Sequence, residues 1–298
     1  MTSTSSIVRP GLGAVLLAPA IVFMTVFLIL PFLWVFAISF TNQTLLGATA
    51  THYEFVGLSN YVRLFDFATF MEPGNFGNAF VITCAFVLAS VIGQAGIGFS
   101  VALMFLGRKG IVKSVIFTLI TLVWILPDVA VAFSWKSVLD YDDGLLNAAA
   151  AGLGFNPIDW QIDHPLLSIC VFNIWRGTAF SLLLFSAALE SLPPSYFENA
   201  KVLGASRWAI FFDITLPLVR RHLLSSTLLT TLWTFTLFSP YLITGGGPAF
   251  KSEVLSILTY RLAFKEFDFG AGGAIALLVM LLNFVLVTIH LRVQRKEH

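Results

Sequence analysis

Two charged side chains, Asp128 and Arg176, lie within long apolar stretches of the sequence. A charge in such surroundings is costly and usually serves an ion pair or a polar path. At about 1.5 Å per helical residue, Asp128 lies roughly 20 Å from one end of its stretch and Arg176 roughly 15 Å from the opposite end of the next. We therefore expect the two side chains to face the interior, as an ion pair or as polar walls of a solute cavity. The alternative is that they only fix helix packing.

Aromatic faces and amide groups at similar depth could contact a hydroxyl-rich solute, because such pockets combine apolar walls with a few placed polar groups. With 30 Phe and seven Trp, however, most aromatic side chains must face lipid or pack against one another. The candidate pathway residues are Asn78, Trp124, Asp128, Asn173, Trp175, Arg176, Trp233, Phe235 and Tyr241. The glycines in these stretches are interpreted as sites of close helix contact.

Residue patterns for catalysis or metal binding are missing from the sequence. The five histidines are scattered, and Cys84 and Cys170 are single residues within apolar segments. There is neither a G-x-x-x-x-G-K-[ST] phosphate loop nor a G-x-S-x-G elbow. We expect no catalytic residue, no metal site and no cofactor in this chain. The net charge of +1 offers no attraction for nucleic acid.

Composition indicates an integral membrane protein. The 298 residues are 57% apolar and 11% charged, against about a quarter charged in a soluble domain. Apolar runs near the roughly 20 residues needed to cross a bilayer occur six times. They are 11–41, 79–106, 114–135, 166–189, 223–243 and 270–291. Their length and continuity predict helices, since lipid leaves every backbone group to be paired within the protein.

The basic residues predict the orientation. With both termini in the cytoplasm, eleven of the 17 Lys and Arg residues fall on the cytoplasmic side, as the positive-inside rule requires. They are Arg9, Arg108, Lys109, Lys113, Lys201, Arg207, Arg220, Arg221, Arg292, Arg295 and Lys296. The same topology makes segment 190–222 a long cytoplasmic loop, and long loops in compact proteins usually carry function.

This loop predicts a helix–turn–helix beneath the membrane. Ser195 and Glu198 have capping-box spacing, so we expect a short helix from there to residue 203. Gly204 then supplies a left-handed stop, and Ser206 caps a second short helix through residue 212. Pro217 marks the start of the next membrane helix. From spacing alone, the element could equally be an interfacial anchor for the loop.

The loop also carries a specific pattern. Glu198-Asn199-Ala200 is followed after three residues by Gly204, and nine residues later by Ile214-Thr215-Leu216-Pro217. This resembles the permease motif of ATP-binding-cassette importers, EAA, three residues, Gly, nine residues, Ile-x-Leu-Pro, with Asn199 as the one departure. The resemblance implies that the ATPase-coupling residues are Ser195, Phe197, Glu198, Asn199, Ala200, Lys201, Gly204, Ala205, Ile214, Leu216 and Pro217.

The resemblance covers most of the chain and is to the carbohydrate-uptake permeases of the maltose-system and glycerol-3-phosphate-system type. Further matching segments are Ala18-Pro19-Ala20 with Pro31, the FVGLSNY of 55–61, Gly144 with Asn147, and the GGGP of 245–248. It implies an all-α type I permease fold with six transmembrane helices and a cytoplasmic coupling helix, in one domain over 11–298 after a cytoplasmic tail at 1–10.

The resemblance also implies partners and a location. The partners would be a second homologous permease subunit, two copies of a cytoplasmic ATP-binding subunit that bind ATP and Mg, and an extracytoplasmic solute-binding protein. The location would be the bacterial inner membrane. The alternatives are an ion-coupled secondary transporter or a channel subunit, which would show internal repeats and more buried charges, and a membrane enzyme, which would show clustered catalytic groups.

Overall fold

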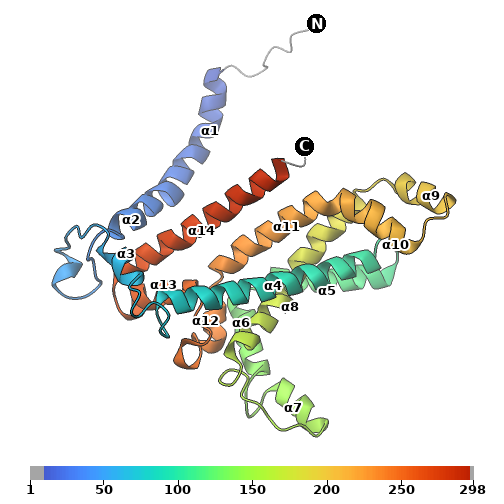
Figure 1. The fold of residues 1–298 in the computed structure, drawn as a ribbon. Helices are drawn as coiled ribbons and strands as arrows, with labels where there is room; N and C mark the ends of the chain where they lie inside the picture. Colours follow the sequence, from blue (N-terminus) through green and yellow to red (C-terminus); the bar gives the residue numbers. More distant parts are fainter. Residues whose placement is uncertain (1–9, 296–298) are drawn as a thin grey trace. The chain divides into compact units, whose positions relative to one another are not determined.

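The computed structural model describes residues 10–295, so the expected tail at 1–10, except Pro10, lies outside the described residues. Every element in this part of the chain is helical, and two isolated β-bridges are its only strand-like pairing (Figure 1). The predicted all-α fold is confirmed. The chain divides into two compact units. One comprises residues up to Leu64 together with Thr259–Leu278, and the other comprises Phe65–Leu258 and the segment from Val279.

The first unit contains the opening helical run and the segment that leads into the last helix. Its elements are α1 (Pro10–Met24), η1 (Thr25–Ile29), α2 (Leu30–Ile38), η2 (Ala48–Ala50), α3 (Ser59–Leu64), the end of α13 (Leu255–Tyr260), η5 (Arg261–Lys265) and the start of α14 (Phe269–Arg295).

The run from α1 to α2 is continuous because a π-helical turn accommodates a proline. Pro31 has no amide to donate to the carbonyl four residues earlier, and its ring would crowd that carbonyl. The helix forms the π-helical turn η1 at this point, in which the Leu30 amide donates to the Thr25 carbonyl. The wider turn relieves the clash without ending the helix.

Polar contacts hold the end of α2 beside the start of α14 within this unit. The Asn60 side-chain amide donates to the carbonyls of Ser39 (2.8 Å) and Thr41 (2.9 Å). Asp268 accepts from the Ala271 amide at the first turn of α14 (2.8 Å) and pairs with Arg63 (2.6 Å). These bonds satisfy backbone groups that a helix end leaves open.

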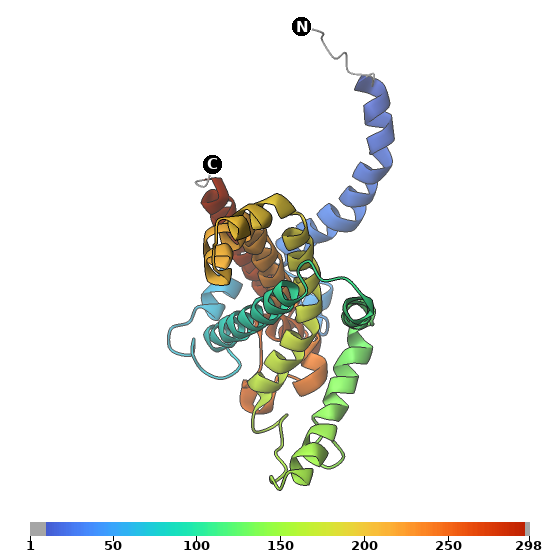
Figure 2. The same ribbon diagram turned by 90° about the vertical axis from the view of Figure 1, so that its right-hand side faces the viewer.

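The second unit contains the longest helix–helix contact. Its elements are α4 (Phe76–Met104), α5 (Ile111–Ile125), α6 (Asp128–Val138), α7 (Leu145–Gly152), α8 (Pro165–Glu190), α9 (Pro194–Val202), α10 (Arg207–Ala209), η3 (Ile210–Thr215), α11 (Leu216–Thr236), α12 (Pro240–Thr244) and η4 (Pro248–Phe250). Helices α4 and α8 pack along much of their length. Figures 1 and 2 show α7 near the first end of α8, and α9 with α10 at its other end.

Glycine makes the α4–α8 contact close. A Cβ added at Gly98 would lie 2.8 Å from the Ser181 Cβ and 2.9 Å from the Leu182 backbone nitrogen. Gly96, on the exposed side of α4, has no atom within 4 Å of such a Cβ. The interpretation of the glycines as contact sites therefore holds for Gly98 and not for Gly96. Small residues let helices approach where lipid provides no hydrophobic drive for association.

Two of the stretches predicted as continuous membrane helices are each divided into two helices, so their predicted boundaries are wrong. The stretch 114–135 is divided into α5 and α6, which meet at an angle of 103°. Leu126 is extended there (ψ 141°) because the residue before a proline avoids the helical region. The stretch 223–243 is α11 followed by the short α12. Leu237 between them is extended, and Pro240 lacks an amide to continue the ladder.

The helices that are long and apolar enough to cross a bilayer account for five of the six predicted spans. Four are single helical runs, Val15–Ile38, Phe76–Met104, Pro165–Glu190 and Phe269–Arg295, and the bent pair α5–α6 supplies a fifth among the described residues. Helix α11 is not one of them. It begins with charged residues, Arg220 and Arg221, and carries many hydroxyl side chains.

The segment between α6 and α8 is organised by one buried amide. Asn147, 4% exposed, donates through Nδ2 to the carbonyls of Tyr141 (3.0 Å) and Ile158 (2.9 Å). Its Oδ1 accepts from the Ile158 amide (3.2 Å) and from Trp160 Nε1 (3.1 Å). Because one side chain satisfies groups from three places in the loop, Asn147 fixes the position of α7.

Candidate functional site

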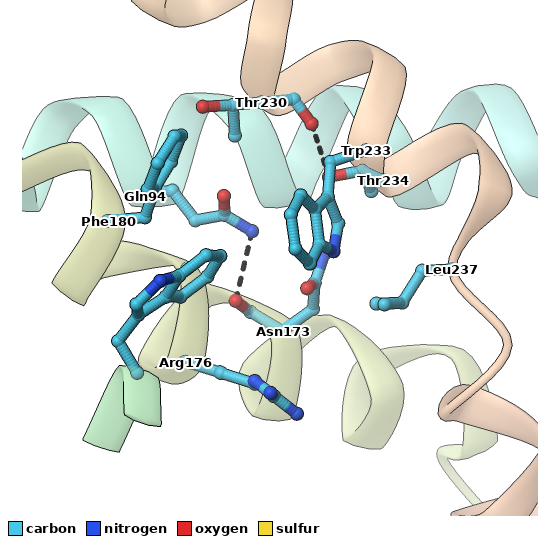
Figure 3. A pocket seen from close by; sticks show the side chains of 10 residues that line it. Gln94, Asn173, Arg176, Phe180, Thr230, Trp233, Thr234 and Leu237 are labelled. Carbon is cyan, nitrogen blue, oxygen red and sulfur yellow. Dashed lines mark hydrogen bonds between the residues drawn. The ribbon is translucent and has the colours of Figure 1, made fainter. Parts of the chain in front are cut away.

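A small cavity lies within the second unit, where α4, α5, α8 and α11 approach one another. Figure 3 shows its lining side chains converging from these helices. They are Gln94, Trp124, Asn173, Arg176, Gly177, Phe180, Thr230, Trp233, Thr234 and Leu237. The cavity volume is about 20 Å³, which is room for about one water molecule.

One wall of the cavity is aromatic. Trp124 of α5 stacks on Phe180 of α8, with ring centroids 4.8 Å apart. Trp124 also contacts Trp233 of α11, with centroids 5.0 Å apart and the rings tilted by 54°. Three helices therefore meet through three rings. Such a cluster offers the flat apolar surface that covers the C–H faces of a sugar ring.

Two amide side chains also line the cavity. Gln94, 2% exposed, donates from Nε2 to the Asn173 carbonyl oxygen at 2.9 Å. Gly177 makes room for it, since a Cβ there would lie 2.2 Å from the Gln94 side chain. The Asn173 Nδ2 is buried and has no hydrogen-bond partner among the described residues. A buried donor without a partner is costly, so this amide is suited to a ligand oxygen or a water molecule.

The predicted partners Asp128 and Arg176 form an ion pair. Arg176 lies on α8 and is 9% exposed, while Asp128 is the first residue of α6, directly after the break at Pro127. The Asp128 side chain is 44% exposed. The bend between α5 and α6 thus places Trp124 before the break, in the cavity lining, and Asp128 after it, paired with the cavity-lining Arg176.

Helix α11 presents a line of hydroxyl groups to the interior. Ser226, Thr230 and Thr234 recur every four residues and are all buried. The Thr230 and Thr234 hydroxyls donate to the carbonyls one turn earlier, at 2.9 Å and 2.8 Å. Their hydrogens are occupied, and each hydroxyl oxygen keeps a lone pair that can accept a hydrogen bond. Thr230 and Thr234 both line the cavity. The cavity therefore offers amide donors and hydroxyl acceptors beside the aromatic wall.

The cavity brings together four of the nine predicted pathway residues: Trp124, Asn173, Arg176 and Trp233. Asp128 joins them through the ion pair. The remaining four lie elsewhere. Asn78 is half-buried in the first turn of α4, Trp175 packs on Trp135, Phe235 belongs to the hydrophobic core, and Tyr241 lines a different hollow beside α12.

The prediction missed the other six lining residues, which are Gln94, Gly177, Phe180, Thr230, Thr234 and Leu237. Two signals could have found some of them. Gln94 is an amide in the middle of an otherwise apolar run, where an unpaired polar group is costly. Thr230 and Thr234 continue a four-residue polar period on one helix, which indicates a shared face. Phe180 carries no such signal among so many phenylalanines.

The loop between α8 and α11 contains the two predicted short helices, with a different start for the first. Helix α9 begins at Pro194 with Pro193 as its N-cap, and no side chain caps it. The predicted capping box of Ser195 and Glu198 is therefore wrong. Pro194 fits the first helical position because its ring fixes the required φ and its missing amide would be unpaired there anyway, which moves the start ahead of Ser195.

The end of α9 and the start of α10 agree with the prediction. Gly204 is left-handed (φ +78°), and the amides of Gly204 and Ala205 donate back to the carbonyls of Lys201 (3.0 Å) and Ala200 (2.9 Å). This is the Schellman pattern that ends helices at glycine. The Ser206 hydroxyl accepts from the Ala209 amide at 3.1 Å and caps α10. The predicted second helix continues into π-helical η3 and joins α11.

At the junction of η3 and α11, a π-helical turn again precedes a proline, as it does at Pro31. The Leu216 amide bonds to the Phe211 carbonyl in a π turn directly before Pro217. The chain from Arg207 to Thr236 is therefore one helical run. Ile214, Leu216 and Pro217 lie on this run and not in the α9 helix. A force applied at α10 would reach the cavity-lining part of α11 without crossing a loop.

Helix α9 has one face against the unit and one face open. Ala200 is buried and Phe197 half-buried, beside a hollow of about 400 Å³. The hollow is lined by Leu106, Gly107, Leu189, Glu190, Leu192, Pro194, Phe197, Glu198 and Lys201. The tip of the helix is uncovered, with Val202 87% and Leu203 85% exposed. The tip therefore presents two adjacent exposed apolar side chains beside the charged Lys201.

Comparisons with known proteins agree with this arrangement. Residues 94–297 match the protein family described as "Binding-protein-dependent transport system inner membrane component". The chain is 29% identical over 300 residues to the trehalose/maltose transport system permease protein MalF of Thermococcus litoralis, covering 99% of this chain and 97% of that one. It is 29% identical over 291 residues to the sulfoquinovosyl glycerol transport system permease protein SmoG of Agrobacterium fabrum, covering 96% and 91%.

The fold is also similar to a solved structure. A chain of a bacterial alginate ABC transporter, in complex with an alginate pentasaccharide-bound periplasmic protein, superposes with a TM-score of 0.80. The match covers 97% of this chain and 95% of that chain at 21% sequence identity. The similarity shows a shared fold.

Proposed function

The chain belongs to the family of binding-protein-dependent transport system inner membrane components, and from this premise we propose that it forms half of a solute pathway in an ATP-driven importer. The solute class is a sugar or a related carbohydrate. The observation that carries the proposal is that the family match at 94–297 contains both the cavity and the α9 loop.

The carbohydrate assignment is supported by the relatives and by the cavity. The names of two relatives specify trehalose/maltose and sulfoquinovosyl glycerol as their systems' solutes. The cavity supplies an aromatic face, a free amide donor on Asn173 and threonine hydroxyls. Ring C–H faces and hydroxyl groups require this combination, because every buried hydroxyl must find a partner.

Energy for transport would come from a separate ATPase subunit. The sequence has no phosphate-binding loop, so ATP and its Mg would be held by two copies of that partner. The open face of α9, with Glu198 and the exposed Val202 and Leu203, would be its docking surface. The helical run from α10 through α11 would then carry the movement of the ATPases to the cavity.

Two further partners complete the proposed complex. A second permease subunit would supply the other half of the path, and a solute-binding protein would deliver the solute from outside. Both termini and α9 would be cytoplasmic, following the distribution of basic residues. We include α11 as a sixth span, because its hydroxyl groups face the interior of the unit and not lipid.

The experiment is ATP-dependent uptake of radiolabelled saccharides into liposomes that contain the assembled complex. Glu198→Lys should lower uptake and receptor-stimulated ATP hydrolysis by about tenfold or more, since reversing a charge at a docking contact disturbs its electrostatic complementarity. Glu198→Gln is the matched control and should retain most of the uptake. Gly204→Asp and Gly204→Asn form a second pair, because both side chains tolerate left-handed backbone and differ in charge.

Two results would contradict the proposal. The first is uphill uptake by the purified chain alone, without any ATPase, which would favour an ion-coupled transporter. The second is normal coupling in both Glu198→Lys and Gly204→Asp, with the ATPase subunits still bound. That outcome would remove α9 from the coupling path.

A further inference from the structure

Arg176 is the only charged side chain among the ten that line the cavity, and its charge is compensated by Asp128. We propose that Asp128 is a specificity-determining residue that keeps this part of the pathway electrically neutral, so that uncharged saccharides are favoured over those carrying a carboxylate. The inference rests on the proposed function and concerns the class of carbohydrate that the pathway accepts.

The bend between α5 and α6 is what delivers this compensating charge. Leu126 and Pro127 end α5, and the chain turns by 103° before α6 begins at Asp128. The Asp128 carboxylate sits in the first turn of an 11-residue helix, where the helix dipole favours a negative charge. The backbone therefore places the Asp128 carboxylate beside the cavity-lining Arg176 of α8.

The buried partner needs this anion. Arg176 is 9% exposed, and a guanidinium so far from water is strongly destabilised when its counter-ion is removed. The Asp128 side chain is 44% exposed. Water can therefore solvate a substituted side chain at position 128 more easily than one at position 176. The Arg176 guanidinium is therefore already paired with Asp128 when no solute is bound.

A neutral sugar and an acidic sugar meet this pair differently. A neutral sugar can use the Asn173 amide and the α11 hydroxyls without disturbing the ions. A carboxylate would have to compete with Asp128 for Arg176, or lie beside Asp128 without a counter-charge. Without Asp128, the guanidinium would be free to bind a carboxylate with two parallel hydrogen bonds.

The test is direct binding of a matched probe pair, p-nitrophenyl glucoside and p-nitrophenyl glucuronide, to the detergent-purified permease–ATPase complex. The solute-binding protein is omitted so that its own selectivity cannot contribute. Quenching of tryptophan fluorescence reports occupancy, because Trp124 and Trp233 line the cavity. The wild-type protein should bind the glucoside more tightly. Asp128→Asn should shift the affinity ratio towards the glucuronide by at least about tenfold, which corresponds to about 1.4 kcal/mol.

Two further variants separate charge from structure. Asp128→Glu keeps the ion pair and should retain the wild-type ratio. The double variant Asp128→Asn with Arg176→Gln removes both charges and should bind the two probes about equally. Equal affinities in the wild-type protein, or an Asp128→Asn variant that weakens both probes to the same extent, would overturn the inference and leave the pathway intact. Failure of the glucoside to quench wild-type fluorescence would count against the proposed pathway itself.

Discussion

The close packing of α4 on α8 at Gly98 gives a quantitative prediction for Gly98→Ala. The new methyl group would lie 2.8 Å from the Ser181 Cβ and 2.9 Å from the Leu182 backbone nitrogen. Ordinary contact needs about 3.4 Å or more, so the helices must separate by roughly half an ångström. One of the obstructing atoms is backbone, so a side-chain rotation cannot relieve the clash. Overpacking of this kind costs about 1–3 kcal/mol.

Gly96→Ala is the matched control on the same helix. Both substitutions replace a helical glycine and gain about 1 kcal/mol of helix propensity. A Cβ at Gly96 meets nothing within 4 Å. The shared propensity term cancels in the comparison, so Gly98→Ala should be less stable than Gly96→Ala by about 1–3 kcal/mol.

The free energy of unfolding is measured by titrating SDS into mild-detergent micelles and following far-UV circular dichroism. Gly96→Ala should unfold at the same or a higher SDS fraction than the wild-type protein, and Gly98→Ala at a lower fraction. Stabilities of the two variants within about 0.5 kcal/mol of each other would refute the claim that Gly98 sets the distance between α4 and α8.

Three more substitutions test separate parts of the structure. Pro127→Ala restores an amide at the break, so α5 and α6 should straighten, and the distance between spin labels on the two helices should increase in electron paramagnetic resonance. Asn147→Ala leaves the backbone partners of its side chain unpaired, which should destabilise the segment around α7 by about 1–3 kcal/mol. Hydrogen exchange should become faster around α7 but not around α9. Ser206→Ala removes the cap of α10 at about 1 kcal/mol, and should accelerate exchange of the Ala209 amide.

Long apolar runs were the most reliable guide from sequence to structure. The stretch 166–189 is α8, and 79–106 lies largely within α4, because a run of this length in lipid has to pair its backbone internally. Breaks within a run were harder to foresee. Pro31 and Pro217 are absorbed by π turns, whereas Pro127 ends a helix. A proline therefore marks a disturbed helix without deciding between a bulge and a break.

The candidate site was predicted in part for an equally physical reason. Asp128 and Arg176 were found because a charge within an apolar run has few explanations, and the structure pairs them. Trp175 and Phe235 were assigned by depth alone, and depth does not specify which way a side chain points around the helix. Gln94 was missed, although its amide is as isolated among apolar neighbours as the two charges are.

The size of the cavity bears on how the pathway must be built. A cavity volume of about 20 Å³ holds a water molecule and is too small for a sugar ring. The same cavity contains a buried amide donor without a partner and two threonine hydroxyls, which one bound water can satisfy in this conformation. We infer that these groups are one wall of a larger space, which opens when the helices move apart and is completed by a second permease chain. The aromatic contacts of Trp124 with Phe180 and Trp233 close the space in this conformation. Because Trp124 lies just before the bend and Asp128 just after it, a movement of α5 and α6 would displace the aromatic wall and the ion pair together.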